Sequence, residues 1–401
     1  MDSKDLIAIE DVYGAHNYHP LDVVISKAQG IWMHDVEGRK YLDFLSAYSA
    51  VNQGHRHPRI VRALLDQARK LTLTSRAFRN DQWPMLAKEL AEMTGYSMVL
   101  PMNSGAEAVE TAVKAARKWA YQKKGVPQDR AEIIACANNF HGRTVTAISF
   151  STEPLYRQDF GPFTPGFTII PFGDAAALEK AITPNTAAFL VEPIQAEAGI
   201  LIPPDGFLKR AAEICRANNV LFIADEIQTG LGRTGKLFAC EHEGVRPDMV
   251  VVGKSLGGGC YPVSAVVADR EILGVFKPGE HGSTFGGNPL GCAVARESLR
   301  VIREEKLVEN AAERGAFFME KLRKVRSRHI KEVRGRGLLI GIELHPAAGG
   351  ARRFCEELMK EGLLCKETHD NVIRFAPPLI IRDKDLNWAL KRIKTVFRRL
   401  A

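Results

Sequence analysis

The sequence has 401 residues, of which 45% are hydrophobic and 25% are charged, and its formal net charge is +8. A chain of this length can form about two to three domains, and this composition excludes a disordered or fibrous protein. No apolar stretch reaches the length of a membrane span, so a membrane is not an expected partner. Basic residues lie in short runs (391–392 and 398–399) typical of a solvated helix face, so a nucleic acid is not an expected partner either.

The first 47 residues predict an N-terminal arm and a hairpin. Two apolar stretches, 31–33 and 41–44, flank a turn at Glu37-Gly38. The arm carries acidic residues and has neither a cationic nor an apolar region, so no secretory or organellar leader is predicted and a cytoplasmic location is expected. The seven scattered cysteines include no CxxC pair, and we expect reduced thiols rather than disulfides or metal ligands.

Apolar strands alternate with amphipathic helices over residues 48–305. This pattern predicts a large α/β domain with a mostly parallel central sheet covered by helices. The predicted strands are 98–100, 133–136, 145–150, 167–170, 188–191, 220–224 and 249–252, and the helices include 106–120 and 207–218. Residues 306–401 predict a smaller C-terminal α+β domain, with helices at 308–325, 351–360 and from about 383, and strands at 338–344 and 372–375.

Two reactive side chains stand at the ends of predicted strands. Asp225 ends the strand 220–224, and Lys254 follows the strand 249–252 just before three glycines. Ligands bind beyond the carboxyl ends of the strands of a parallel sheet, so we expect both side chains to face one site. An amine that forms a Schiff base and a carboxylate that pairs with a pyridinium nitrogen are the protein groups that pyridoxal phosphate needs.

A third strand end predicts a phosphate site. After the strand 98–100 the sequence reads Asn-Ser-Gly-Ala and enters a helix, so Ser104, Gly105 and Ala106 place backbone N–H groups at the positive end of that helix. A plain helix cap by Asn103 or Ser104 explains the same letters equally well. Together with Lys254 and Asp225, this loop favours pyridoxal 5'-phosphate as the cofactor.

A glycine-rich motif and four histidines give weaker predictions of function. Residues 230–235 spell the dinucleotide fingerprint GxGxxG, but five residues separate them from the strand and no clear helix follows, so a nicotinamide enzyme is a weak alternative. His55, His57, His141 and His281 lack a zinc-type spacing and are interpreted as hydrogen-bonding loop residues, with no metal site expected.

The assembled motifs resemble those of the class III (subgroup II) aminotransferases of pyridoxal-phosphate fold type I. The resemblance runs nearly end to end, and within the class the chain is most similar to the members that act on ornithine. The motifs that carry it are YGAHNYHPL (13–21), LSAYSAVNQGH (45–55), TLTSRAF (72–78), NFHGRT (139–144), VEPIQAEAG (191–199), ADEIQTGLGRTG (224–235), GEHGSTFGGNPLG (279–291) and IRFAPPL (373–379).

The resemblance implies a role for each matching position. Lys254 would hold the cofactor, and Asp225 would keep the ring nitrogen protonated. The other cofactor contacts would be Ser104, Gly105 and Ala106 at the phosphate, Phe140 and Ile227 on the two ring faces, His141 beside them, Gln228 at the ring hydroxyl, and Ser283 and Thr284, which would reach the cofactor of the neighbouring subunit of a homodimer. The substrate pocket would contain Tyr18, Tyr48, Arg143, Glu197 and Arg374.

The implied reaction transfers the δ-amino group of L-ornithine to 2-oxoglutarate, giving L-glutamate 5-semialdehyde and L-glutamate. Glu197 would mask Arg374 while ornithine reacts, and a buried arginine on an apolar strand does need an anion. Acetylornithine or 4-aminobutyrate aminotransferase is the alternative within the class. Tyr18 and Tyr48 argue against it, because both could hold a free α-amino acid head group. His141 departs from the tryptophan of the animal ornithine enzymes, which concerns the outer wall of the pocket.

Overall fold

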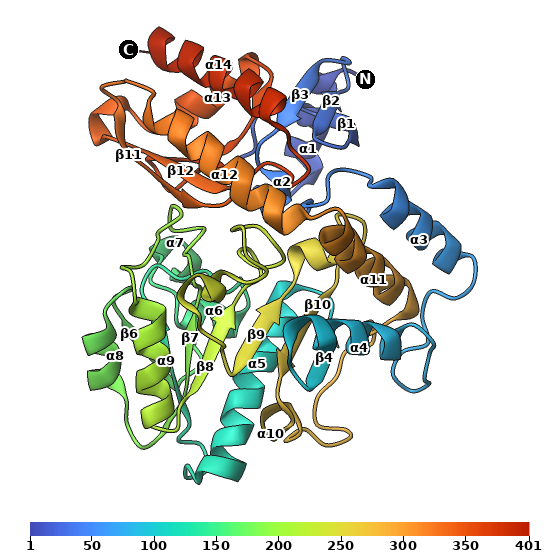
Figure 1. Ribbon diagram of the computed structural model, residues 1–401, viewed down its shortest axis with the longest axis vertical. Coiled ribbons are helices and arrows are strands. Elements are labelled where there is room, and N and C mark those ends of the chain that lie inside the picture. The colour runs from blue at the N-terminus through green and yellow to red at the C-terminus, as the bar shows by residue number, and fades with distance from the viewer. Residues whose placement is uncertain (401) are drawn as a thin grey trace.

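The computed structural model describes residues 1–400 and has two parts, which lie one above the other in Figure 1. The lower part contains a seven-stranded sheet, and the upper part contains two four-stranded sheets together with both chain ends. No helix in the described part of the chain has the length and apolar character needed to cross a membrane.

The N-terminal section forms the predicted hairpin and a helix that was not predicted. α1 (Ser3–Tyr13) starts at a capping box on Asp2 and buries none of its residues. β1 (Ile25–Gln29), β2 (Trp32–Asp35) and β3 (Lys40–Asp43) pair in antiparallel fashion. The fourth strand of this sheet is β13 (Leu363–Leu364), parallel to β3, so the N-terminal and C-terminal sections of the chain share one sheet.

The central sheet has the order β4-β10-β9-β8-β7-β5-β6. Its strands are β4 (Met98–Met102), β5 (Glu132–Cys136), β6 (Phe167–Ile170), β7 (Thr186–Val191), β8 (Leu221–Asp225), β9 (Met249–Val252) and β10 (Ser264–Ala268). Only β10 runs antiparallel to its neighbours, which confirms the mostly parallel sheet. β10 itself was not predicted.

Helices cover both faces of this sheet. α5 (Gly105–Trp119) packs on one face, and α8 (Ala175–Ala181) and α9 (Phe207–Ala217) pack on the other. Successive side chains of β8 point to opposite faces of the sheet, which explains the two layers. Ile223 belongs to the apolar cluster that contains α5, and Phe222 belongs to the cluster that contains α9. α5 starts at the carboxyl end of β4 through a capping box between Ser104 and Glu107, which places its first turn at the edge of the sheet where ligands bind.

The segment 145–150 is helical, so the prediction of a strand there is wrong. α6 spans Val145–Ser149, and α7 (Pro154–Arg157) follows it. The hydroxyl of Thr144 accepts a hydrogen bond from the N–H of Ala147 at 3.1 Å and caps the first turn. Alternating β-branched residues favour a strand in isolation, but this cap and the burial of Ala147 and Ile148 decide the conformation.

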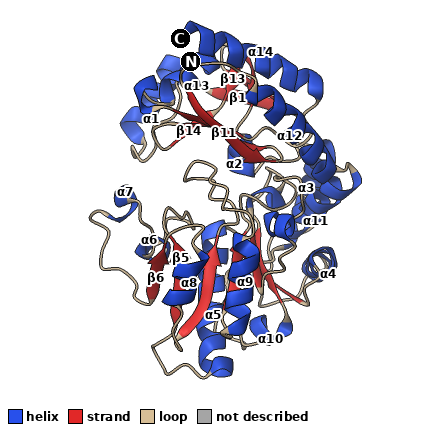
Figure 2. Ribbon diagram, turned by 60° about the vertical axis from the view of Figure 1, so that its left-hand side comes forward, coloured by secondary structure: helices blue, strands red, loops and turns tan. Residues whose placement is uncertain are grey.

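The C-terminal section contains the third sheet, in the order β11-β12-β15-β14. Its strands are β11 (Ile330–Arg336), β12 (Leu339–Leu344), β14 (Lys366–Thr368) and β15 (Val372–Phe375), and its helices are α12 (Leu307–Arg323), α13 (Arg352–Lys360) and α14 (Asp383–Arg399). Figure 2 shows these helices on the outside of the upper part. The helices, β12 and β15 agree with the predictions, and β11 and β14 were not predicted.

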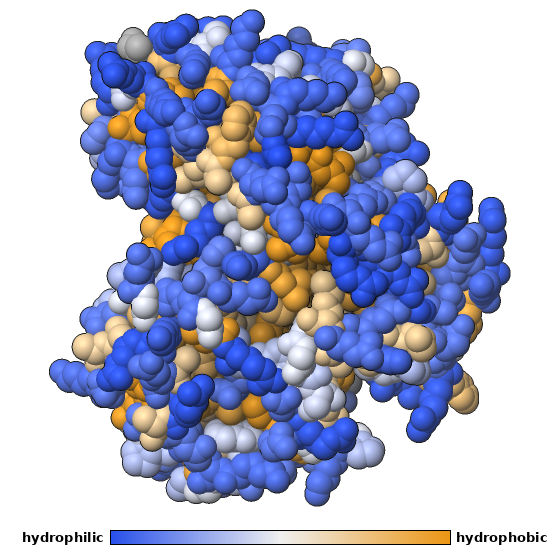
Figure 3. All heavy atoms as spheres, viewed as in Figure 1, coloured by the Kyte–Doolittle hydropathy of each residue, from blue (hydrophilic) through white to orange (hydrophobic). Residues whose placement is uncertain are grey.

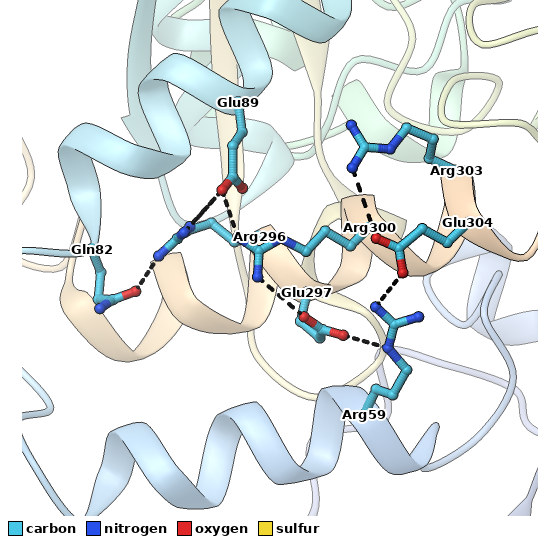
Figure 4. A network of polar contacts seen from close by, with 8 residues as sticks. All are labelled: Arg59, Gln82, Glu89, Arg296, Glu297, Arg300, Arg303 and Glu304. Carbon is cyan, nitrogen blue, oxygen red and sulfur yellow. Dashed lines mark hydrogen bonds and ion pairs between the residues drawn. The ribbon is translucent and has the colours of Figure 1, made fainter.

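α11 (Pro289–Glu304) is fixed to α3 (Pro58–Ala68) and α4 (Trp83–Thr94) by the polar network of Figure 4. Arg59 Nε lies 2.6 Å from Glu297 Oε1, and Arg296 and Arg300 approach Glu89 at 2.9 and 2.7 Å. On its other side α11 supports the turn after β9, where the hydroxyl of Ser298 donates to the carbonyl of Ser255 at 2.7 Å. The network thereby fixes the helix behind Lys254.

Residues 230–235 form a loop that does not open an α-helix; only a short 3-10 helix, Ala239–Glu243, follows, which does not match a dinucleotide-binding fold. Arg233, fully buried in this loop, donates to the carbonyls of Leu338 and Pro377 at 3.0 and 2.7 Å and to Asn52 at 2.5 Å. These bonds connect the lower part to the upper part.

Two glycines bring the parts into direct backbone contact. A methyl group at Gly235 would lie 2.8 Å from the Cα of Ala312, and one at Gly337 would clash with the backbone of Thr234. Apolar side chains gather along this junction in Figure 3.

Candidate active site

Asp225 and Lys254 meet at the carboxyl edge of the central sheet. Asp225 is the last residue of β8, and Lys254 begins a 3-10 turn (Lys254–Gly257) one residue after β9, which runs parallel to β8. Burial lowers the pKa of the Lys254 amine to about 8, although the carboxylates of Glu197 and Asp225 oppose the shift. A larger share of this amine is therefore neutral near neutral pH than in an exposed lysine.

His141 lies beside Asp225 in the wall of the small cavity around Lys254, and not on the outer wall where its departure from tryptophan was expected to act. Its ring is buried, and its Nδ1 lies 2.7 Å from Asp225 Oδ2. Burial lowers the pKa of His141, but the hydrogen bond and the charge of Asp225 raise it by more, so the pKa is raised overall. The N–H of Ile227 donates to Asp225 Oδ1 at 3.1 Å. Asp225 is thus held in place through both oxygens.

A second buried carboxyl group, Glu192, was not predicted. It directly follows β7, and it accepts the N–H of Phe140 at 2.8 Å. Burial raises its pKa to about 7, with the charge of His141 opposing and that of Asp225 adding to the shift. The rule that identified Asp225, an acid directly after an apolar strand, would also have identified Glu192.

The raised pKa of Glu192 predicts a pH-dependent stability. The folded protein holds a proton on Glu192 up to about pH 7, whereas the ordinary value is 4.5. The stabilising contribution is full below pH 4.5 and is lost as the pH rises to 7, and it amounts to about 3 kcal/mol. Glu192→Gln keeps the acceptor for Phe140 and removes this titration. Melting temperatures measured from pH 4.5 to 8 should show the variant gaining on the unmodified apoenzyme as the pH rises; parallel curves would contradict the assignment.

A cavity of about 150 Å³ lies between these groups. Its wall residues include Phe140, Ile227, Asp225 and Lys254, with Gly105 and Ala106 from the first turn of α5. The first N–H groups of a helix have no acceptor within the helix, so they point into this space as free donors at its positive end. The predicted ring and phosphate neighbours are therefore brought together around one cavity.

Ser283 lies beside the start of α5 in its own chain. Its hydroxyl accepts a hydrogen bond from Asn103 Nδ2 at 2.8 Å, and Thr284 is exposed next to it. Ser104 caps α5, its hydroxyl accepting the N–H of Glu107 at 3.2 Å. The cap does not use the N–H groups of Gly105 and Ala106.

A second cavity, of about 590 Å³, opens above Lys254 between the two parts. It brings together Tyr18, Tyr48, Arg143 and Glu197, four of the five residues predicted for the substrate pocket. Arg143 lies against an aromatic face, with its Cζ 3.9 Å from the ring centroid of Tyr156. Tyr156 was missed, because nothing in its local sequence distinguishes it from a packing residue.

Arg374, the fifth residue, lies behind Glu197. It is 1% exposed in the middle of β15, and its Nη1 donates to Glu197 Oε1 at 2.9 Å. The side chain of Gln228 donates to the same oxygen at 2.9 Å, so Gln228 contacts the ion pair as well as the cavity of Lys254. Burial raises the pKa of Glu197, but the charge and hydrogen bond of Arg374 lower it by a larger amount. The pKa of Glu197 is therefore lowered overall, to about 2. Glu197 is consequently ionised at every physiological pH.

The family is decided by a match over almost the whole chain. The family profile described as aminotransferase class-III matches residues 13–397. The chain belongs to the class-III aminotransferases. It is therefore an enzyme that transfers amino groups, and the fold type predicted from its sequence is confirmed.

Relatives of this class-III aminotransferase cover 98% or more of it. An ornithine aminotransferase of Brevibacillus brevis is 64% identical over 396 residues, 98% of each chain. A solved ornithine aminotransferase of Toxoplasma gondii ME49 is 49% identical, with a TM-score of 0.98 and coverage of 100% of this chain and 96% of that one. An acetylornithine aminotransferase structure from Elizabethkingia anophelis is 50% identical, with a TM-score of 0.91 and full coverage of both chains.

Proposed function

We propose that this class-III aminotransferase transfers the δ-amino group of L-ornithine to 2-oxoglutarate, forming L-glutamate 5-semialdehyde and L-glutamate. The observation that carries the proposal is the Arg374–Glu197 pair beside the cavity of Lys254. An aminotransferase specific for α-amino acids needs a free arginine for the α-carboxylate, whereas here a carboxylate occupies that arginine. The identity of 64% to an ornithine aminotransferase supports the same substrate.

Pyridoxal 5'-phosphate is the proposed cofactor, and the residues present fit it. The small cavity has an amine at Lys254, a carboxylate at Asp225, apolar walls at Phe140 and Ile227, and free helix N–H groups. The cofactor supplies an aldehyde that accepts the amino group and a ring that withdraws electrons. Lys254 would bind it covalently and, once released, would take a proton from the substrate carbon and return it. Asp225 would keep a proton on the ring nitrogen.

The substrate residues would serve two unlike molecules. Ornithine brings no carboxylate to its reacting δ-carbon, so Glu197 stays on Arg374 while Arg143 and Tyr18 hold the distant α-carboxylate. The oxo acid brings a carboxylate beside its reacting carbon, so Glu197 moves aside and Arg374 binds that carboxylate. One ion pair replaces another, which keeps the change in free energy small.

Product identification tests this function. Ornithine, acetylornithine and 4-aminobutyrate are each incubated with 2-oxoglutarate, and the products are identified by mass spectrometry. We expect the semialdehyde from ornithine to form fastest. Faster turnover of acetylornithine would replace the proposed function by that of the Elizabethkingia anophelis relative.

The cytoplasm is the proposed compartment, supported by seven cysteines that are all free thiols.

The proposed assembly is a homodimer in which Thr284 and Ser283 reach the phosphate of the partner's cofactor. Thr284 is exposed and available for such a contact. Mixing inactive Lys254→Ala and inactive Thr284→Arg chains should restore about a quarter of the activity, because half of the dimers are hybrids and each has one intact site. Mass spectrometry of labelled chains verifies the exchange of subunits. Exchange without recovery of activity would place Thr284 in the site of its own chain.

A further inference from the structure

The segment before the substrate pocket contains an unusual backbone turn. Ser46, Ala47, Tyr48 and Ser49 form α2 and have φ angles of 49°, 45°, 60° and 74°. Residues with a Cβ adopt this left-handed conformation singly, and four in succession are strongly disfavoured. The hydroxyls of Ser46 and Ser49 are also buried without a hydrogen-bond partner. Something outside the turn must hold it in this conformation.

Asp43 at the end of β3 holds the turn. One oxygen of this buried carboxylate accepts the N–H groups of Leu45 and Ser46 at 2.8 and 2.9 Å, and the other lies 2.7 Å from His55 Nε2. Packing does not hold the outer side of the turn, because Ala47 is exposed beside a cavity of about 490 Å³. The hydrogen bonds of Asp43 therefore fix the start of the turn, and the N–H of Val51, which donates to the carbonyl of Ser46 at 3.0 Å, closes it.

The turn determines where the ring of Tyr48 lies. Arg374 Cζ is 5.2 Å from the centroid of this ring, so Tyr48 covers one face of the guanidinium. The two terminal nitrogens of the guanidinium are occupied as well, since Nη1 donates to Glu197 and Nη2 donates to the carbonyl of Ala196 at 3.0 Å, and Nε is buried without a partner. A carboxylate that approaches Arg374 must consequently displace Glu197.

We infer that Asp43 and His55 are positioning residues, which hold the left-handed turn Ser46–Ser49 so that Tyr48 covers Arg374 and carboxylates reach it only by displacing Glu197. The inference rests on the proposed function, since it explains how the enzyme discriminates ornithine from glutamate. A relaxed turn would move Tyr48 away and expose the face of Arg374. The α-carboxylate of ornithine could then bind there, and the preference for δ-amino transfer would fall.

The first measurement uses the apoenzyme and does not depend on activity. Burial, and to a smaller extent Glu197, raise the pKa of the Tyr48 phenol. The enzyme is labelled with ¹³C at the Cζ atom of its tyrosines. The NMR signal that disappears in Tyr48→Phe is assigned to Tyr48, and its pH titration gives the pKa. We expect Asp43→Ala, which removes the acceptor for both N–H groups, to lower the pKa of Tyr48, because the ring becomes exposed. His57→Ala is the matched control, since His57 pairs with Glu305 at 3.0 Å and does not touch the turn.

The second measurement is the ratio of single-turnover rates with ornithine and with glutamate. We expect Asp43→Ala to lower this ratio by about tenfold, the effect of losing one aromatic cover over a cation. Adding Ala47→Gly to the Asp43 variant should recover part of the ratio, because glycine adopts the left-handed conformation without strain. A merely structural role for Asp43 predicts no such rescue.

The outcomes separate the two proposals. If Asp43→Ala does not fold, His55→Ala carries the same expectations. A folded variant with an unchanged Tyr48 pKa and an unchanged ratio overturns the inference. If the unmodified enzyme does not convert ornithine, the proposed function fails, while the NMR titration still decides whether Asp43 positions Tyr48.

Discussion

Lys254→Ala is expected to lose covalent attachment of pyridoxal phosphate and about 10⁴-fold in turnover, the upper range for removal of a general acid–base group. The physical reason is that Lys254 is the sole amine lining the small cavity and that its lowered pKa of about 8 makes it reactive. No other side chain that lines this cavity carries an amine that could form the covalent bond to the aldehyde of the cofactor.

Borohydride reduction followed by peptide mass spectrometry checks this expectation. The unmodified enzyme should show the cofactor mass on the peptide that contains Lys254, and Lys254→Ala should show none. Lys384→Ala, on the exposed surface of α14, is the matched control and should behave as the unmodified enzyme does. Cofactor fixed to another lysine of Lys254→Ala would show that the assignment is wrong.

Glu197→Ala should shift the enzyme from ornithine towards glutamate. Removing one partner of a desolvated ion pair typically costs about 2 kcal/mol or more, which corresponds to a change of about 30-fold or more in the ratio of the two half-reactions. Arg374 then remains free to bind α-carboxylates, so the glutamate half-reaction should accelerate relative to that of ornithine. The α-amine of ornithine should also begin to react.

Single-turnover absorbance kinetics with each amino acid measure the ratio. Glu197→Gln is the matched variant, because it keeps the size and one acceptor oxygen of Glu197 but removes the charge. Both variants should shift the ratio in the same direction if charge masks Arg374. An unchanged ratio in both variants would show that Glu197 does not act as a gate.

The carboxyl edge of the sheet could be predicted because its signals are local. An apolar run followed by Asp225, Lys254 or the start of α5 can be recognised from a few neighbouring letters, and parallel pairing then brings them together. The resemblance added the residues of the larger cavity, which come from opposite ends of the chain.

Features that depend on distant partners could not be predicted. His141 is 84 residues from Asp225, and only the fold shows that its ring is the support of that carboxylate. The turn Ser46–Ser49 contains no glycine, so its left-handed backbone has no signature in the sequence. At 145–150 the β-branched pattern was misleading, because the cap at Thr144 lies outside the run that suggested a strand.

The glycine contact between the two parts acts as a fixed pivot for the catalytic groups. Lys254 stands on the lower sheet and Arg374 on the upper one. The loop with Gly235 and the β11–β12 turn with Gly337 set the separation of those sheets where backbone meets backbone. With no side chain there to compress, the parts cannot approach each other further at this point. Adaptation to two substrates therefore falls to side chains such as Glu197, and a methyl group added at the pivot would spread the reacting groups apart from a position outside the site.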